Sequence, residues 1–155
     1  MIKKILVLLL VVFVGAQFFG PDKNEGDLTS IDAFMAETKP PNNVKIILQE
    51  TCFDCHSNVT RYPWYNNITP VNYWLNNHIK GGKKHFNVSN WEGNSIKRKD
   101  HKFDELIEMV EEKYMPLNTY TWTHSEANLT DEQRKSVMDW AKLVRVKYGL
   151  EPKAE

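Results

Sequence analysis

The chain has 155 residues, and its twenty lysines and arginines balance its twenty aspartates and glutamates, so its formal net charge is zero. This length predicts a single domain. A chain without a surplus of basic residues lacks the electrostatic footprint of a nucleic-acid-binding protein, so we expect no nucleic-acid partner.

The first twenty residues predict an export segment. Lys3 and Lys4 precede an unbroken apolar run over residues 5–16. The length of this run falls between the apolar part of a signal peptide, about 7–15 residues, and a membrane span, about 20 residues. Residues 1–20 are therefore expected to be either a membrane anchor or a signal peptide cleaved after Ala16. In both cases the lysines stay on the cytoplasmic side and the body lies outside, on the periplasmic side of the inner membrane.

The next part of the chain predicts a linker and then an ordered domain. Residues 21–42 are polar, with a proline-containing break at their end, and are expected to be a linker with a short helix near 30–37. The domain is expected over residues 43–150. It begins with an amphipathic helix whose apolar residues recur at helical spacing: Val44, Ile47 and Leu48.

This helix runs into the sequence Cys52-Phe53-Asp54-Cys55-His56. The pattern Cys-x-x-Cys-His is typical of the covalent attachment site of a c-type haem. In such a site the two thiols form thioethers with the haem vinyl groups, and the histidine is the proximal iron ligand. We therefore expect Cys52, Cys55 and His56 to bind one haem c per chain, because these are the only two cysteines.

Other uses of the two thiols fit the sequence less well. A zinc site needs four Cys or His ligands, usually as two spaced pairs, whereas here one pair is accompanied by scattered histidines. A thioredoxin-like redox pair sits in a βαβ pattern, and no such pattern is present. A lone disulfide does not call for a histidine directly after the second cysteine.

Three further helices are predicted after the motif. Thr69 is expected to cap the first, with Pro70 at its first position and Gly81-Gly82 at its end. Thr130 is expected to cap the last, with Gln133 in the capping-box position. The apolar faces of the three helices carry these residues: Val71, Trp74, Leu75 and His78; Phe103, Leu106, Ile107 and Val110; Val137, Trp140, Ala141 and Val144. No segment alternates with period two, so the fold class is all-α, with four to five helices around one covalently attached haem.

Met115 is the expected second iron ligand. It lies in a loop between two predicted helices, and Pro116 stiffens that loop by fixing φ. A thioether opposite a histidine raises the reduction potential of haem iron. His78 is the main alternative ligand, and an open sixth position is another. Further candidates for ligation, haem-edge packing or propionate contacts are His85, His124, Arg61, Trp64 and Trp74.

Taken together, these blocks resemble the bacterial haem-binding domain family of small exported proteins with one Cys-x-x-Cys-His motif. The likeness covers residues 40–146 and rests on the following blocks: 52–58, Thr60, 63–65, 68–71, Trp74, His78, Gly81, 87–91, 115–117, 120–121, 124–127 and 140–141. The loop at Met115 and the helix after Leu129 are also similar to the C-terminal part of class I cytochromes c. The resemblance implies a small cytochrome c-like bundle, a haem cofactor and an axial methionine.

Three hypotheses follow from these observations. The first is a mono-haem cytochrome, with His56 and Met115 as iron ligands, that carries single electrons between redox partner proteins in the periplasm or at the membrane. The second is a haem peroxidase-like enzyme or haem-based sensor with an open or displaceable sixth site. The third is a haem-free module that uses the thiols for a disulfide or zinc. The electron carrier is favoured over an enzyme.

Overall fold

The computed structural model describes residues 1–150, which form helices and loops without a β-strand. The four long helices are α1 (Ile2–Ala16), α5 (Val71–His85), α6 (Ile96–Glu111) and α8 (Asp131–Leu150). The shorter α-helical segments are α2 (Asp32–Thr38), α3 (Asn42–Ile47), α4 (Phe53–His56) and α7 (Asn118–Thr121). Five further turns are η1 (Leu28–Ile31), η2 (Leu48–Cys52), η3 (Trp64–Asn67), η4 (Val88–Asn90) and η5 (Ser125–Ala127). The all-α prediction is confirmed. The number of helices exceeds the predicted four to five because short segments surround the motif and the Met115 loop.

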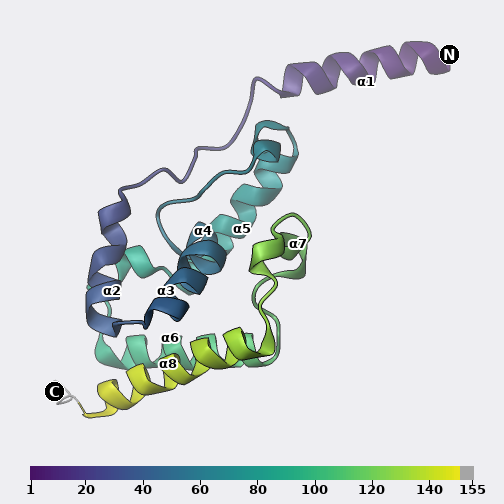
Figure 1. Cartoon of the computed structure of the whole chain (residues 1–155). Coiled ribbons are helices and arrows are strands. Elements are labelled where there is room, and N and C mark those ends of the chain that lie inside the picture. Colours follow the sequence, from purple (N-terminus) through teal and green to yellow (C-terminus); the bar gives the residue numbers. More distant parts are fainter. Residues whose placement is uncertain (151–155) are drawn as a thin grey trace.

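The helices α6 and α8 lie side by side at the base of the molecule (Figure 1). Both begin at a side-chain cap. The Ser95 hydroxyl accepts a hydrogen bond from the Arg98 amide at 3.3 Å. The predicted capping box is present at the start of α8, where the Thr130 amide donates to Gln133 Oε1 at 2.8 Å and the Gln133 amide donates to Thr130 Oγ1 at 3.2 Å. These bonds satisfy amides that a helix start leaves without partners.

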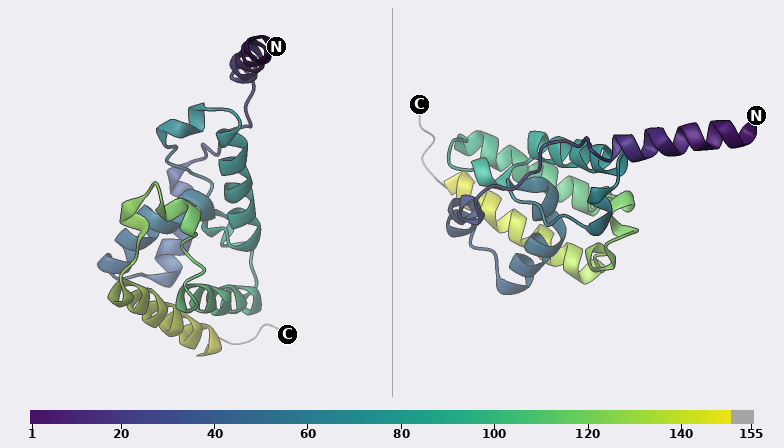
Figure 2. Two further views of the ribbon diagram at one scale, coloured as in Figure 1. Left: turned by 90° about the vertical axis from the view of Figure 1, so that its right-hand side faces the viewer. Right: turned by 90° about the horizontal axis from the view of Figure 1, so that it is seen from above.

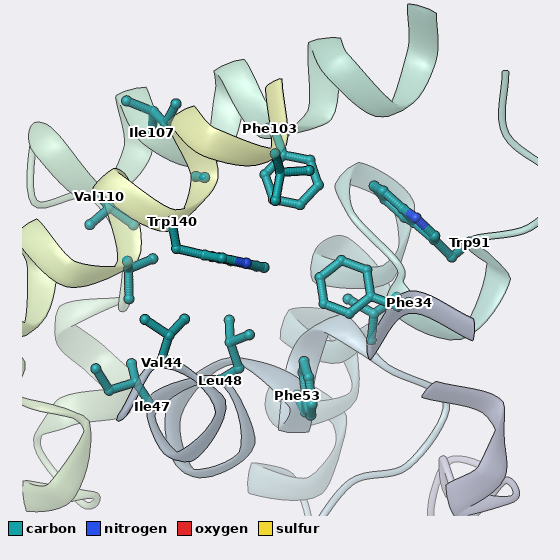
Figure 3. Close-up of a cluster of buried hydrophobic side chains, with 14 of the residues drawn as sticks. Phe34, Val44, Ile47, Leu48, Phe53, Trp91, Phe103, Ile107, Val110 and Trp140 are labelled. Atoms are coloured by element: carbon teal, nitrogen blue, oxygen red, sulfur yellow. The ribbon is translucent and has the colours of Figure 1, made fainter. Parts of the chain in front are cut away.

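Phe34 lies at the centre of the aromatic core (Figure 3). Its side chain is fully buried. Its ring centroid lies 5.0 Å from that of Trp91, 6.1 Å from that of Trp140 and 6.3 Å from that of Phe53. These pairs meet edge to face, the arrangement that aromatic quadrupoles favour. Because Phe53 is part of the Cys-x-x-Cys-His motif, this cluster joins the motif to the base helices.

The segment over residues 21–42 is therefore more than the predicted linker. It supplies Phe34 to the core, and it pairs with the chain that follows the motif. The Gly26 amide donates to the Asn58 carbonyl at 2.8 Å, and the Thr60 amide donates to the Asn24 carbonyl at 3.0 Å. The segment is mostly polar in composition, yet its Phe34 side chain is fully buried.

The helix α1 projects away from the body in all three views (Figures 1 and 2). Its large apolar side chains are all exposed. Its 15 residues compare with about 20 for a span of the hydrocarbon core. Within residues 1–150, no helix combines the length and the apolar character needed to cross a membrane. The anchor alternative for residues 1–20 is thus not supported, and the signal-peptide alternative stays a prediction.

Both ends of α5 differ from the prediction. The helix begins at Val71 without a side-chain cap, and the Thr69 hydroxyl instead donates to the Phe19 carbonyl and accepts from Asn72 Nδ2, both at 2.9 Å. At the other end, the helix continues through Gly81-Gly82 to His85. The glycines do not end this helix, and Gly82 has a different role at the motif.

Candidate functional site

The Cys-x-x-Cys-His motif occupies the end of η2 and all of α4. Its two variable residues are both buried, Phe53 at 6% exposure and Asp54 at 5%. Phe53 packs into the aromatic core, whereas Asp54 is held by polar partners. Cys52 and Cys55 are half-buried and are not joined in a disulfide. Both thiols are thus available for another bond.

His56 is fixed through one ring nitrogen. Its Nδ1 lies 2.9 Å from the Phe86 carbonyl oxygen. A carbonyl can only accept, so Nδ1 carries the proton and Nε2 is the nitrogen with a free lone pair. Burial lowers the pKa of His56, against the opposing effect of the hydrogen bond to Phe86. A neutral imidazole oriented by a backbone carbonyl is the usual form of a metal-binding histidine.

Burial also acts on the two thiols. It raises the pKa of Cys52 to about 12 and that of Cys55 to about 11, with a further contribution from the Asp54 carboxylate at both. Both residues are therefore thiols at neutral pH in the folded chain. They do not have the depressed pKa that marks a catalytic cysteine nucleophile.

Gly82 allows α4 to lie directly on α5. A Cβ atom built on Gly82 would be 2.5 Å from the Cys55 carbonyl oxygen and 3.0 Å from Cys55 Cβ. A side chain of any size at this position would push the two helices apart. The glycine thus sets the distance between α5 and the motif.

A narrow crevice, partly open to solvent, lies beside Cys55 and has a cavity volume of only about 10 Å³. It is lined mainly by aromatic and aliphatic side chains from η3, α5 and the segment around α7: Cys55, Tyr65, Trp74, Leu75, His78, Leu117, Thr119 and Tyr120. A volume of about 10 Å³ is that of about one water molecule, so the crevice is an apolar seam beside the thiol and not a preformed cavity for a large group. The donor set of two thiols and one oriented imidazole fits a c-type haem held by Cys52, Cys55 and His56, although of these three residues only Cys55 lines the crevice.

Asp54 connects the motif to two other parts of the chain. Arg61 binds both of its oxygens, with Nε 3.1 Å from Oδ1 and Nη2 3.0 Å from Oδ2. The Tyr120 hydroxyl donates to Oδ2 at 2.8 Å. Burial raises the pKa of Tyr120, and the Asp54 charge raises it further, so the phenol remains a donor. A buried carboxylate held by an arginine fork is well compensated.

Met115 is held by its backbone. Its amide donates to the Met109 carbonyl at 3.0 Å, and its carbonyl accepts from Arg134 Nη1 at 2.8 Å. Its side chain is half-buried but is not among the residues that line the crevice. Leu117, Thr119 and Tyr120 of the same loop do line it. The structure therefore brings the loop to the motif without joining the thioether to it.

The other candidates from the sequence fall into two groups. His78 and Trp74 line the crevice, and His78 Nδ1 lies 2.9 Å from the Trp74 carbonyl oxygen. His124 stacks on Tyr120 with ring centroids 4.0 Å apart. The remaining three do not line the crevice. Arg61 pairs with Asp54, and His85 and Trp64 are exposed. Propionate binding by Arg61 would compete with its ion pair.

Asn24 was missed by the sequence analysis because it lies in the expected linker. Its Nδ2 donates to the Ser57 carbonyl and to Thr60 Oγ1, both at 2.9 Å. Its Oδ1 accepts from Lys83 Nζ at 2.5 Å. One amide side chain therefore fixes the residue after His56 to the α5 helix. No pattern in a single sequence marks this residue.

The alternative of a zinc site receives no support from the part of the chain that the structure describes. Within residues 1–150, no group of three or more His, Cys, Asp or Glu side chains is arranged to hold a metal ion.

A family model described as a haem-binding domain matches residues 11–143, which is most of the chain. No curated protein and no solved structure matched the chain.

Proposed function

The chain belongs to the haem-binding domain family, and on that premise we propose that it is a c-type haem protein with one covalently attached haem. Cys52 and Cys55 form the thioethers, and His56 is the proximal ligand. The observation that carries this proposal is the bond from His56 Nδ1 to the Phe86 carbonyl at 2.9 Å. It orients an imidazole beside two unpaired thiols, as a proximal ligand requires.

Met115 is the second iron ligand in this proposal. The proposal is supported by the loop around it, whose Leu117 and Tyr120 line the crevice beside Cys55. It is also supported by the two backbone bonds of Met115 to α6 and α8. A fixed backbone lowers the entropic cost of holding a weak thioether ligand.

The biological role we propose is transfer of single electrons between periplasmic partners. Haem, when bound, supplies an iron that gains or loses one electron. The apolar side chains around the motif would shield that iron from water, and the protein ligands would set its potential. Export through a cleaved signal peptide is supported by Gln17, the first residue after the small residues Gly15-Ala16. The Gln17 side chain accepts a hydrogen bond from the Thr69 amide at 2.9 Å and donates one to the Thr69 carbonyl at 3.1 Å. The large apolar side chains that precede Gln17 are exposed.

A haem-based sensor or peroxidase-like enzyme is the second candidate function. One observation favours it, namely that His78 lines the same crevice with its Nδ1 bound to the Trp74 carbonyl at 2.9 Å. A polar side chain on the distal side is what an enzyme with an open sixth position would use.

The experiment that separates the two functions is the visible spectrum of ferric protein matured with covalent haem. The electron carrier predicts a low-spin spectrum with a thioether–iron charge-transfer band that is lost in Met115→Ala and kept in His78→Ala. A high-spin spectrum and rapid cyanide binding in the unmodified protein would favour the second candidate. Covalent haem staining that persists in Cys52→Ser/Cys55→Ser would contradict both.

A further inference from the structure

Asp54 and Tyr120 are 66 residues apart in the sequence and form one hydrogen bond of 2.8 Å between the motif helix and α7. The bond is protected, because Asp54 is only 5% exposed and Arg61 occupies its remaining acceptor positions. A hydrogen bond to a buried charge is worth more than one between neutral groups in water.

The segment over residues 115–120 is fixed at both ends. At its start, the Met115 backbone is bound to α6 and α8 through the Met109 carbonyl and Arg134. At its end, Tyr120 is bound to Asp54. The residues between these two points, Leu117 and Thr119, are the ones that line the crevice.

The attachment at Tyr120 is the only one of the two that reaches the haem-attachment helix. Its ring is supported from the other side by His124, with which it stacks at 4.0 Å and an interplanar angle of 10°. Without the hydroxyl, the stack would remain but the bond to α4 would be lost. The segment would then have no hydrogen bond to the motif helix.

We propose that Tyr120 and Asp54 are positioning residues that hold the 115–120 segment over the crevice and so limit the access of added ligands to the iron. This inference rests on the proposed binding of haem at His56. It deepens that proposal by assigning a role to one variable residue of the motif. A ligand that enters from the side of this segment must displace it, and the Asp54–Tyr120 bond opposes that displacement.

The test compares full-chain holoprotein with its Tyr120→Phe variant in a titration of the ferric form with imidazole. We expect imidazole affinity to rise about tenfold in Tyr120→Phe, the factor that corresponds to loss of one hydrogen bond to a charged group. Amide hydrogen exchange over residues 117–121 should accelerate in the same variant.

The matched control is Tyr73→Phe. Tyr73 lies on α5, is 44% exposed and is not among the residues that line the crevice. This control should keep the affinity and exchange rates of the unmodified protein. A Tyr120→Phe affinity within twofold of the unmodified protein, or an equal gain in Tyr73→Phe, would overturn the proposal.

The titration also separates this inference from the proposed ligation. If Met115→Ala keeps the spectrum of the unmodified protein, ligation by Met115 is wrong. The comparison of Tyr120→Phe with Tyr73→Phe still decides the positioning role, because imidazole binds the iron whichever group it displaces. Circular dichroism confirms that each variant is folded before it is titrated.

Discussion

Gly82 meets Cys55 more closely than any residue with a side chain could. A Cβ on Gly82 would lie 2.5 Å from the Cys55 carbonyl oxygen, whereas nothing lies within 4 Å of a Cβ on the neighbouring Gly81. The two glycines share a helix and differ only in what faces them. They therefore offer a matched pair of substitutions.

Gly82→Ala is expected to destabilise the protein and to reduce the yield of covalent haem, because the backbone of α4 has to move away from α5. Overpacking of this kind costs about 1–3 kcal/mol. Gly81→Ala is expected to be neutral or to stabilise the helix by up to about 1 kcal/mol. Urea unfolding and haem content per protein measure both effects. Equal losses in the two variants would contradict the role given to Gly82.

Phe34→Ala is expected to lower the free energy of unfolding by about 3–5 kcal/mol, the usual cost of removing a buried phenylalanine ring. Phe34 is fully buried and meets Trp91, Trp140 and Phe53. The control is Phe18→Ala, because Phe18 is 84% exposed. Chemical denaturation of both variants tests whether residues 21–42 belong to the folded unit. If Phe34→Ala lowers the free energy of unfolding only slightly, residues 21–42 are a linker and not part of the folded unit.

Glu37 is expected to make folding sensitive to acid. Burial alone would raise its pKa, but hydrogen bonds from Lys99 at 2.7 Å and Tyr148 at 2.6 Å outweigh burial and hold the pKa below its ordinary value of 4.5. A group with a lowered native pKa stabilises the fold fully above its unfolded pKa and loses that contribution as pH falls through the native one.

Stability should therefore fall as the pH drops below about 4.5, and less steeply in Glu37→Gln than in the unmodified protein. Glu132→Gln, at an exposed position, should follow the unmodified curve. Thermal melting between pH 3 and pH 7 provides the comparison, on a scale set by ordinary carboxyl titration. Parallel curves for Glu37→Gln and the unmodified protein would remove Glu37 as the cause.

Asn24→Ala is expected to cost about 1–3 kcal/mol, because it leaves the Ser57 carbonyl and Lys83 without their partner in a partly buried position. The change should also broaden the resonances of the His56 ring, since Ser57 follows it directly. Asn77→Ala is the control, because Asn77 is exposed on the same helix as Lys83. Urea unfolding and NMR of the histidine ring nitrogens measure the two effects.

Local signals in the sequence predicted the parts of the fold that depend on neighbours in the chain. The capping box of Thr130 and Gln133 is such a signal, and α8 starts where it predicts. The haem motif likewise predicted the cofactor that the matching family model describes. Both features involve residues within five positions of one another.

The features that were missed depend on distant contacts. Gly82 was interpreted as a helix end, because a glycine in a sequence gives no sign of whether a partner backbone approaches it. The Asp54–Tyr120 bond joins residues 66 positions apart, and nothing in either local sequence favours the other. Phe34 was missed because Ile31, Phe34 and Met35, although they recur at helical spacing, lie in a mostly polar segment that was interpreted as a linker.

The docking of Gln17 and Asn24 on the body defines the smallest piece of this chain that can carry the site. The segment from residue 17 to residue 38 contributes side chains that hold the backbone at Thr69 and at Ser57, and it fills the centre of the aromatic core. A shortened protein that began at residue 43, directly before the motif helices, would keep both cysteines and the histidine. It would lose Phe34 and the hydrogen bond from Asn24 to the Ser57 carbonyl, directly after His56. A transplantable haem-binding unit therefore has to begin at or before Gln17.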